Sequence, residues 1–234
     1  MFATPFNPRP ISMVGALPFI VCVVWFSTTS AFAQSEPPEN PETTVLEYHW
    51  SNGNLMERKE VYEDAEGQKI NHGEYRFFHL NGKLREEVRY VHGDRQGEAK
   101  MYHENGKLAS TTNFKDDKQE GTEVLFDPEG VKFATFQYQN DLPHGKWTWY
   151  YPDGQPTQEI TYHEGVEEGP WQWWYPSGQL GIQGTYHQDE QHGNWKYWNK
   201  KGELQETREY DLGILQTPPK YLPKLESEEK SLPQ

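Results

Sequence analysis

Glycine recurs at a fixed interval through most of this chain, and this periodicity limits the possible folds more than any other feature. One glycine series repeats every 24 residues, and a second follows nine residues after each member of the first. A period in this range is typical of repeat architectures, in which each unit packs on its neighbours. The two series are Gly73, Gly97, Gly121, Gly145, Gly169, Gly193 and Gly82, Gly106, Gly130, Gly154, Gly178, Gly202.

Aromatic residues keep the same register. One slot, seventeen residues after each first glycine, is aromatic in all six repeats: Tyr90, Phe114, Tyr138, Tyr162, Tyr186 and Tyr210. Another is aromatic throughout as well: Phe78, Tyr102, Phe126, Tyr150, Trp174 and Trp198. The constancy of this second slot predicts a structural stripe.

Each repeat is predicted to form a β-hairpin. In the repeat that starts at Gly145, a β-prone run at 146–151 precedes the turn Pro152-Asp-Gly154, and a second extended run covers 155–162. Proline presets φ near −65°, and the glycine supplies the positive φ that returns the chain to the ladder. Polar connectors such as 163–169 and 187–193 are expected to reverse the chain into the next hairpin.

The predicted fold is therefore all-β, an elongated single-layer antiparallel β-meander of tandem 24-residue hairpins. Hydrophobic residues are only 34% of the chain while aromatic residues are 15%, which favours a thin core built from rings. Strand alternation places Trp147, Trp149 and Tyr151 on one face, with Thr148 and Tyr150 on the other.

The segments outside the array have different compositions. Residues 1–33 contain one charge, an apolar run at about 11–26 and the sequence Ala31-Phe-Ala33, as in a secretory signal peptide. The alternative, a retained membrane anchor, is less favoured because the run is short for a span of about 20 residues and contains Pro18. After cleavage, no stable membrane insertion is expected, and the protein would be periplasmic or extracellular.

The remaining boundaries follow from composition and spacing. Residues 34–44 are expected to be a disordered linker and 217–234 a disordered tail, because both are rich in Pro, Glu and Ser. Residues 45–72 are interpreted as a degenerate N-terminal cap repeat, since Gly53 precedes Gly82 by 29 residues instead of 24. The six full repeats cover 73–216.

The pattern G-x-W-x-x-[YW]-[YHF]-x-x-G, followed by the later aromatic slot, resembles the MORN repeat in its longer bacterial variant, over about Tyr48 to Asp211. Proteins with this variant are often grouped with a YwqK-type antitoxin-like family. The resemblance implies an interaction or scaffolding surface and brings no catalytic residue with it. The export signal fits poorly with a cytoplasmic antitoxin.

Several other functions are not favoured by the sequence. The formal net charge of −14 argues against nucleic-acid binding, which needs a basic face. The only cysteine, Cys22, lies in the apolar run, so no disulfide framework is expected. Recurrent histidines such as His163 and His187 would lie two strands apart, about 9.6 Å, too far for one metal ion, so no metal or cofactor is predicted. No nucleophile motif or phosphate loop is present, and we expect no enzymatic activity.

The leading hypothesis is an exported, non-enzymatic scaffold that binds a protein partner through an aromatic face. The alternative is a cell-wall or carbohydrate-binding module that uses the Trp/Tyr ladder of repeats four to six. Open sheet edges would also allow self-association. The candidate partner-binding residues are Trp147, Trp149, Tyr151, Trp171, Trp173, Tyr175, Trp195 and Tyr197.

Overall fold

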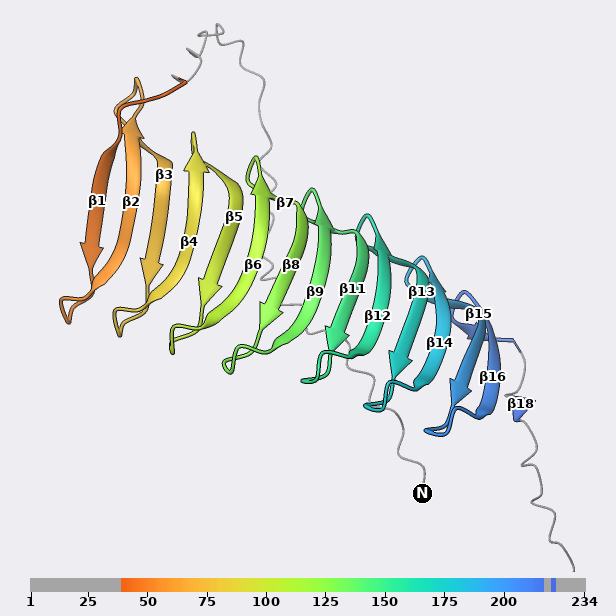
Figure 1. Ribbon diagram of the computed structural model, residues 1–234. Helices are drawn as coiled ribbons and strands as arrows, with labels where there is room; N and C mark the ends of the chain where they lie inside the picture. Colours follow the sequence, from red (N-terminus) through yellow and green to blue (C-terminus); the bar gives the residue numbers. More distant parts are fainter. Residues whose placement is uncertain (1–38, 217–219, 222–234) are drawn as a thin grey trace, which may run out of the picture. The chain divides into compact units, whose positions relative to one another are not determined.

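A computed structural model describes residues 39–216 and 220–221. The predicted signal segment, residues 34–38 of the linker and most of the tail lie outside these residues. Every regular element in the described part is a strand (Figure 1). The strands are β1 (Thr44–His49), β2 (Leu55–Glu63), β3 (Lys69–Phe78), β4 (Leu84–Val91), β5 (Asp94–Tyr102), β6 (Leu108–Lys115), β7 (Lys118–Gln119), β8 (Gly121–Phe126), β9 (Lys132–Gln139), β10 (Leu142–Pro143), β11 (Gly145–Tyr150), β12 (Pro156–His163), β13 (Val166–Trp174), β14 (Leu180–His187), β15 (Glu190–Trp198), β16 (Leu204–Asp211), β17 (Ile214–Leu215) and β18 (Lys220–Tyr221).

All strands belong to one sheet, and successive strands pair in antiparallel fashion, so the chain forms a meander (Figure 1). The two-residue strands β7 and β10 are the beginnings of the strands that continue as β8 and β11, and each pair shares one neighbour. The predicted fold class is confirmed.

The turn inside each hairpin is as the sequence predicted. Gly154 has a φ of 86°, and its N–H donates to the Tyr151 carbonyl at 2.8 Å. The Tyr151 N–H in turn donates to the Gln155 carbonyl at 2.8 Å. The strand register shifts between Trp149 and Tyr150, as in a bulge. The positive φ thus explains the second glycine series.

The connections between hairpins are shorter than the sequence suggested. Only two residues turn, and both have positive φ, as in His92 at 51° and Gly93 at 95°. This is the conformation of a type I′ turn, whose twist matches that of paired strands. The expected connector 163–169 is therefore mostly strand, and Gly169 lies inside β13. Pairing between neighbouring hairpins satisfies backbone groups that an irregular connector would leave exposed.

The N-terminal cap differs from the repeats in one connection. The chain passes from β2 to β3 through a five-residue turn, Asp64–Gln68, in which the Gly67 N–H donates to the Asp64 carbonyl. Each of the two strands is also one residue longer than in the next repeat. The longer turn and the two longer strands account for the spacing of 29 residues between Gly53 and Gly82, where the other repeats have 24. At the other end, β18 pairs with β16, so residues 220–221 of the expected disordered tail belong to the sheet.

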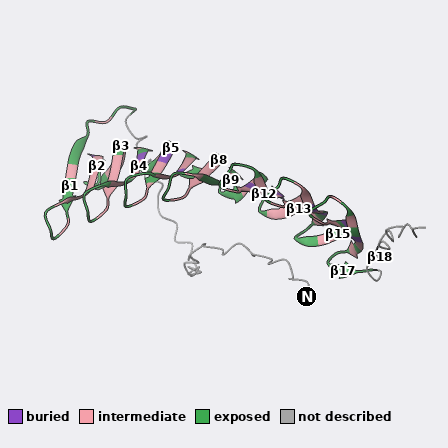
Figure 2. Cartoon of the chain, turned by 60° about the horizontal axis from the view of Figure 1, so that its bottom comes forward, coloured by how far each residue is buried: buried purple, intermediate pink, exposed green. Residues whose placement is uncertain are grey.

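Most of the core lies on one face of the sheet. We call the face that carries Trp147 and Trp149 the ring face and the opposite face the polar face. The register places Val88, Ala99, Ala134, Ile160 and Trp195 on the ring face, and each is at most 5% exposed. Buried positions are short stretches within strands (Figure 2).

The sequence predicts a structural stripe at the slot of Tyr150. It lies on the polar face and is half-buried, and the Tyr150 hydroxyl contacts the Thr135 hydroxyl at 3.1 Å. Thr148 on the polar face is buried too, at 5% exposed, but most buried residues lie on the ring face, where neighbouring strands bring large side chains into contact.

Candidate functional site

The predicted binding residues lie on the ring face in three rows that cross the strands. Each row takes one residue per repeat, so successive members are two strands apart. We name them the inner, middle and turn rows. The inner row is Trp147, Trp171 and Trp195, the middle row is Trp149, Trp173 and Tyr197, and the turn row is Tyr151 and Tyr175.

The inner row packs on the core, with Trp195 buried and Trp147 and Trp171 half-buried. Trp195 is only 3% exposed, and Trp147 stacks on Phe136 with ring centroids 4.3 Å apart. Both indoles donate to backbone carbonyls, Trp147 to Gln137 at 2.9 Å and Trp195 to Thr185 at 3.3 Å. Trp195 therefore has almost no surface to offer a ligand.

Two glycines outside the turn series make room for these rings. A Cβ atom on Gly184 would lie 2.7 Å from the Trp195 Cε3 atom and closer still to two other ring carbons. A Cβ on Gly181 would lie 2.5 Å from the Trp173 Cε3 atom. Each indole thus covers a glycine backbone, an arrangement that supports glycine in strands.

The middle row has no buried member. Trp149, Trp173 and Tyr197 are all half-buried. Successive members are about 9.6 Å apart if strands are about 4.8 Å apart. The ring of Trp173 meets Tyr175 edge-on at 4.7 Å, which fixes its orientation. Burial raises the pKa of the Tyr197 hydroxyl, and the charge of nearby Tyr210 adds to the effect.

The turn row links neighbouring repeats. The Tyr151 hydroxyl donates to the Trp174 carbonyl at 2.8 Å, and the Tyr175 hydroxyl donates to the Trp198 carbonyl at 3.0 Å. Earlier repeats place the side chains of Trp50, His79 and His103 in the same slot, and each contacts the equivalent carbonyl of the next repeat. These residues act as inter-repeat links.

Asp127 interrupts this series. An ionised carboxylate has no hydrogen to donate, and Asp127 instead accepts the backbone N–H groups of Glu129 and Val131 in its own turn. The slot is therefore filled by a residue that stabilises one turn and not the junction with the next repeat.

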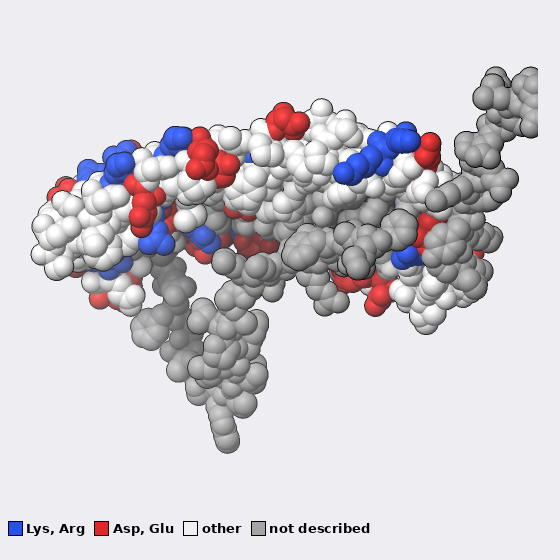
Figure 3. Space-filling view, turned by 90° about the horizontal axis from the view of Figure 1, so that it is seen from below, with Lys and Arg blue, Asp and Glu red and all other residues white. Residues whose placement is uncertain are grey.

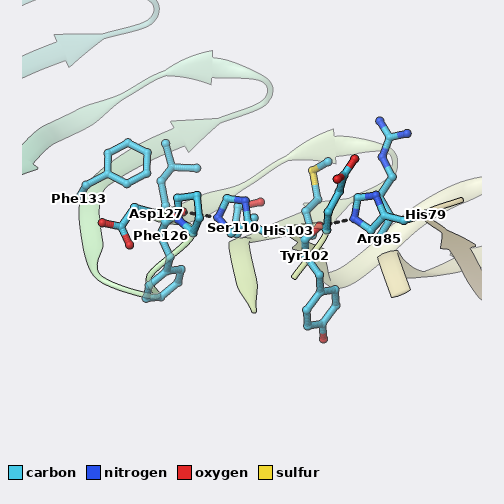
Figure 4. A pocket seen from close by; sticks show the side chains of 13 residues that line it. His79, Arg85, Tyr102, His103, Ser110, Phe126, Asp127 and Phe133 are labelled. Carbon is cyan, nitrogen blue, oxygen red and sulfur yellow. Dashed lines mark hydrogen bonds between the residues drawn. The ribbon is translucent and has the colours of Figure 1, made fainter. Parts of the chain in front are cut away.

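A hollow of about 590 Å³ beside the same turns was missed by the sequence analysis (Figure 4). Its lining includes Met101 and Phe133, which are 42% and 40% exposed. Arg85 also lines it, with its guanidinium 5.5 Å from the Phe77 ring centre. The small side chains Ala109 and Ser110 also line the hollow. Because equally small residues, Gly181 and Ala134, occupy the equivalent positions of other repeats, no distinctive signal for it was available in the sequence.

The histidines form pairs that differ from the one considered in the sequence. His72 and His92 have ring centroids 4.7 Å apart, and His144 lies 5.2 Å from His163. Burial, followed by the nearby His92 charge, lowers the pKa of His72. Within residues 39–216 and 220–221, no group of three or more His, Cys, Asp or Glu side chains is placed to hold a metal ion.

Charged residues of the first hairpins form a network on the polar face. Arg58 lies between Glu47 at 3.5 Å and Glu74 at 3.8 Å, and Arg76 contacts Glu74 at 3.2 Å and Glu87 at 3.9 Å. Figure 3 shows residues of both signs interspersed at one end of the side in view. These arginines are neutralised by carboxylates and do not form a basic surface.

The model of the MORN repeat variant family matches the chain four times, at residues 71–92, 95–116, 143–164 and 167–188. This chain is a MORN-repeat protein. The matches coincide with the repeats that start at Gly73, Gly97, Gly145 and Gly169. The repeats at Gly121 and Gly193 continue the same sheet in the same register.

Other comparisons add little to this result. No curated protein matches the sequence. Among solved structures, a porin-like protein from Bacteroides uniformis ATCC 8492 is similar at 12% identity over 76% of this chain and 88% of that one, with a TM-score of 0.21. That score is too low to support an argument. In the part of the MORN protein that the structure describes, no helix is long and apolar enough to cross a membrane.

Proposed function

We propose that this protein is an exported, non-enzymatic MORN scaffold that binds another protein through the middle row of the ring face. The observation that supports the proposal is that all three members of the middle row, Trp149, Trp173 and Tyr197, are half-exposed, whereas the inner row is interrupted by Trp195, which is 3% exposed. Half-exposed Trp and Tyr side chains held by their neighbours are typical of residues that dominate binding energy at interfaces. Export rests on the sequence of residues 1–33.

The row is also prepared for binding. Trp173 lies over Gly181 and against Tyr175, and Trp149 meets Phe136 edge-on at 5.1 Å. Rings held in this way lose little conformational entropy when a partner covers them. The proposal assigns no catalytic residue and no cofactor.

Photo-crosslinking in the envelope of the source cells tests this proposal. A photoreactive amino acid at position 149 or 173 should give a discrete adduct with a protein partner. Position 174 is the matched control, because Trp174 is the next residue and lies on the polar face. Equal adducts from positions 173 and 174, or adducts from neither, would contradict the proposal.

Carbohydrate binding is a second candidate because of the spacing of the middle row. Rings about 9.6 Å apart are separated by nearly the length of two β-1,4-linked sugar rings, so every second sugar of an extended chain could stack on one ring. Binding of the protein to insoluble peptidoglycan, measured by co-sedimentation and competed by soluble fragments, tests this candidate. The double replacement Trp149→Ala and Trp173→Ala should abolish saturable binding, while Trp174→Ala should retain it.

A further inference from the structure

The two edges of the sheet differ in their protection. At the C-terminal edge, β17 and β18 both pair with β16, through Tyr210 with Leu215 and Glu206 with Tyr221. Pro218 and Pro219 lie between these two short strands in the sequence, and proline has no N–H to offer a further strand. The chain thus covers part of its own last edge.

The N-terminal edge has no comparable protection among the described residues. There β1 is the terminal strand of the sheet and pairs only with β2 (Figure 1). Its sequence, Thr-Val-Leu-Glu-Tyr-His, contains neither lysine nor proline, the residues that commonly blunt such edges. Val45 and Tyr48 are 45% and 44% exposed. β1 therefore offers a six-residue template for another strand.

The preceding part of the chain is poorly suited to that role. Pro37, Pro38 and Pro41 occur just before β1, and each would remove a donor from a ladder. We infer that β1 pairs in antiparallel fashion with β1 of a second copy, around a two-fold axis at Leu46. This surface is separate from the ring rows, so the inference does not rest on the proposed function.

Symmetry restricts the register of this pairing. A two-fold axis that makes two edge strands antiparallel is perpendicular to the sheet, so the ring faces of both copies lie on the same side. Residues opposite each other point to the same face, which allows Leu46 opposite Leu46, Thr44 opposite Tyr48, and Val45 opposite Glu47.

The neighbouring registers are less favourable. A shift that centres the axis on Glu47 would place two carboxylates opposite each other, and like charges there are destabilising. A shift toward Val45 would leave the end of β1 unpaired. With Leu46 on the axis, Glu47 keeps its ion pair with Arg58 of the same copy, at 3.5 Å.

Site-specific disulfide formation tests this arrangement. In the full chain with Cys22→Ser, Leu46→Cys introduces the only thiol. Opposed residues in antiparallel strands have Cα atoms about 4.5–5.5 Å apart, which suits a disulfide. Mild oxidation should therefore give a covalent dimer. Two control variants should remain mostly monomeric on denaturing gels. In Tyr48→Cys, the two thiols of a dimer would be four residues apart along the paired strands, because Tyr48 lies opposite Thr44. In Leu215→Cys, the thiol lies at the other edge of the sheet.

Sedimentation analysis gives an independent measurement. The unmodified chain should sediment as a dimer, and Leu46→Lys, which places like charges on the axis, should sediment as a monomer with an unchanged β spectrum. Ile214→Lys at the C-terminal edge, where Ile214 is 68% exposed, should remain a dimer. A monomer at all concentrations, preferential crosslinking through position 48 or 215, or open-ended oligomers would each overturn the inference.

Discussion

Replacing Gly184 by alanine should destabilise this protein, although the same change in a strand usually does the opposite. Alanine restricts the unfolded chain and would by itself contribute about 0.4–1 kcal/mol of stability. Here its Cβ would lie 2.7 Å or less from three carbons of Trp195, whereas carbon atoms prefer about 3.5–4.0 Å. The ring would have to move by about 1 Å or more.

Trp195 has little freedom to make that movement. Its ring lies 5.3 Å from Trp171 and 5.3 Å from Tyr186, and its N–H bonds to Thr185. Overpacking of this kind costs about 1–3 kcal/mol, so we expect a net loss of about 1–2 kcal/mol. That corresponds to a fall in Tm of about 2–8 °C for a domain of this size.

Thermal melting monitored by circular dichroism would measure this effect, with Gln183→Ala on the exposed neighbouring position as the control. Hydrogen exchange should show the loss first in β14 and β15, because repeat arrays can unfold locally. In a Trp195→Leu background, Gly184→Ala should become neutral or stabilising. An equal loss in both backgrounds would refute the steric explanation.

Three further predictions concern single side chains. Gly154→Val should lower the free energy of unfolding by about 1–3 kcal/mol, because φ at this position is 86° and a valine there is strained even though no atom lies within 4 Å of its Cβ. Gly154→Asn, the control, should melt within a few degrees of the parent. A valine variant that melts at the same temperature as the parent would contradict the turn assignment. Tyr175→Phe should lower the free energy of unfolding by about 1 kcal/mol because the Trp198 carbonyl loses its donor, and an unchanged urea midpoint would argue against the inter-repeat link. Burial raises the pKa of Glu123 above its ordinary value of 4.5, so this carboxyl favours the folded state most below pH 4.5 and that contribution is lost as pH rises through the folded pKa. Glu123→Gln should therefore raise Tm at pH 7 more than at pH 4, unlike Glu129→Gln, and a pH-independent increment would disprove the burial effect.

Much of the architecture could be predicted because its causes are local. The Pro-Asp-Gly turn at 152–154 specifies a positive φ at one position, and the alternation around Trp147 and Trp149 specifies which side chains share a face. Because these signals recur every 24 residues, one hairpin was enough to predict the meander. The connector 163–169 was misjudged because its polar composition concealed strand residues whose partners belong to the next hairpin.

The candidate site could be predicted less well. The sequence alone determined the repeat, the turns and the set of residues on each face, because these depend on backbone preferences and on the two-residue period of a strand. Only the tertiary structure decided that Trp195 is buried over Gly184, that Trp149 and Trp173 remain partly open, and that β1 pairs with β2 alone and leaves its other edge unpaired. Exposure depends on which side chains from adjacent strands meet, and that is a property of the assembled sheet.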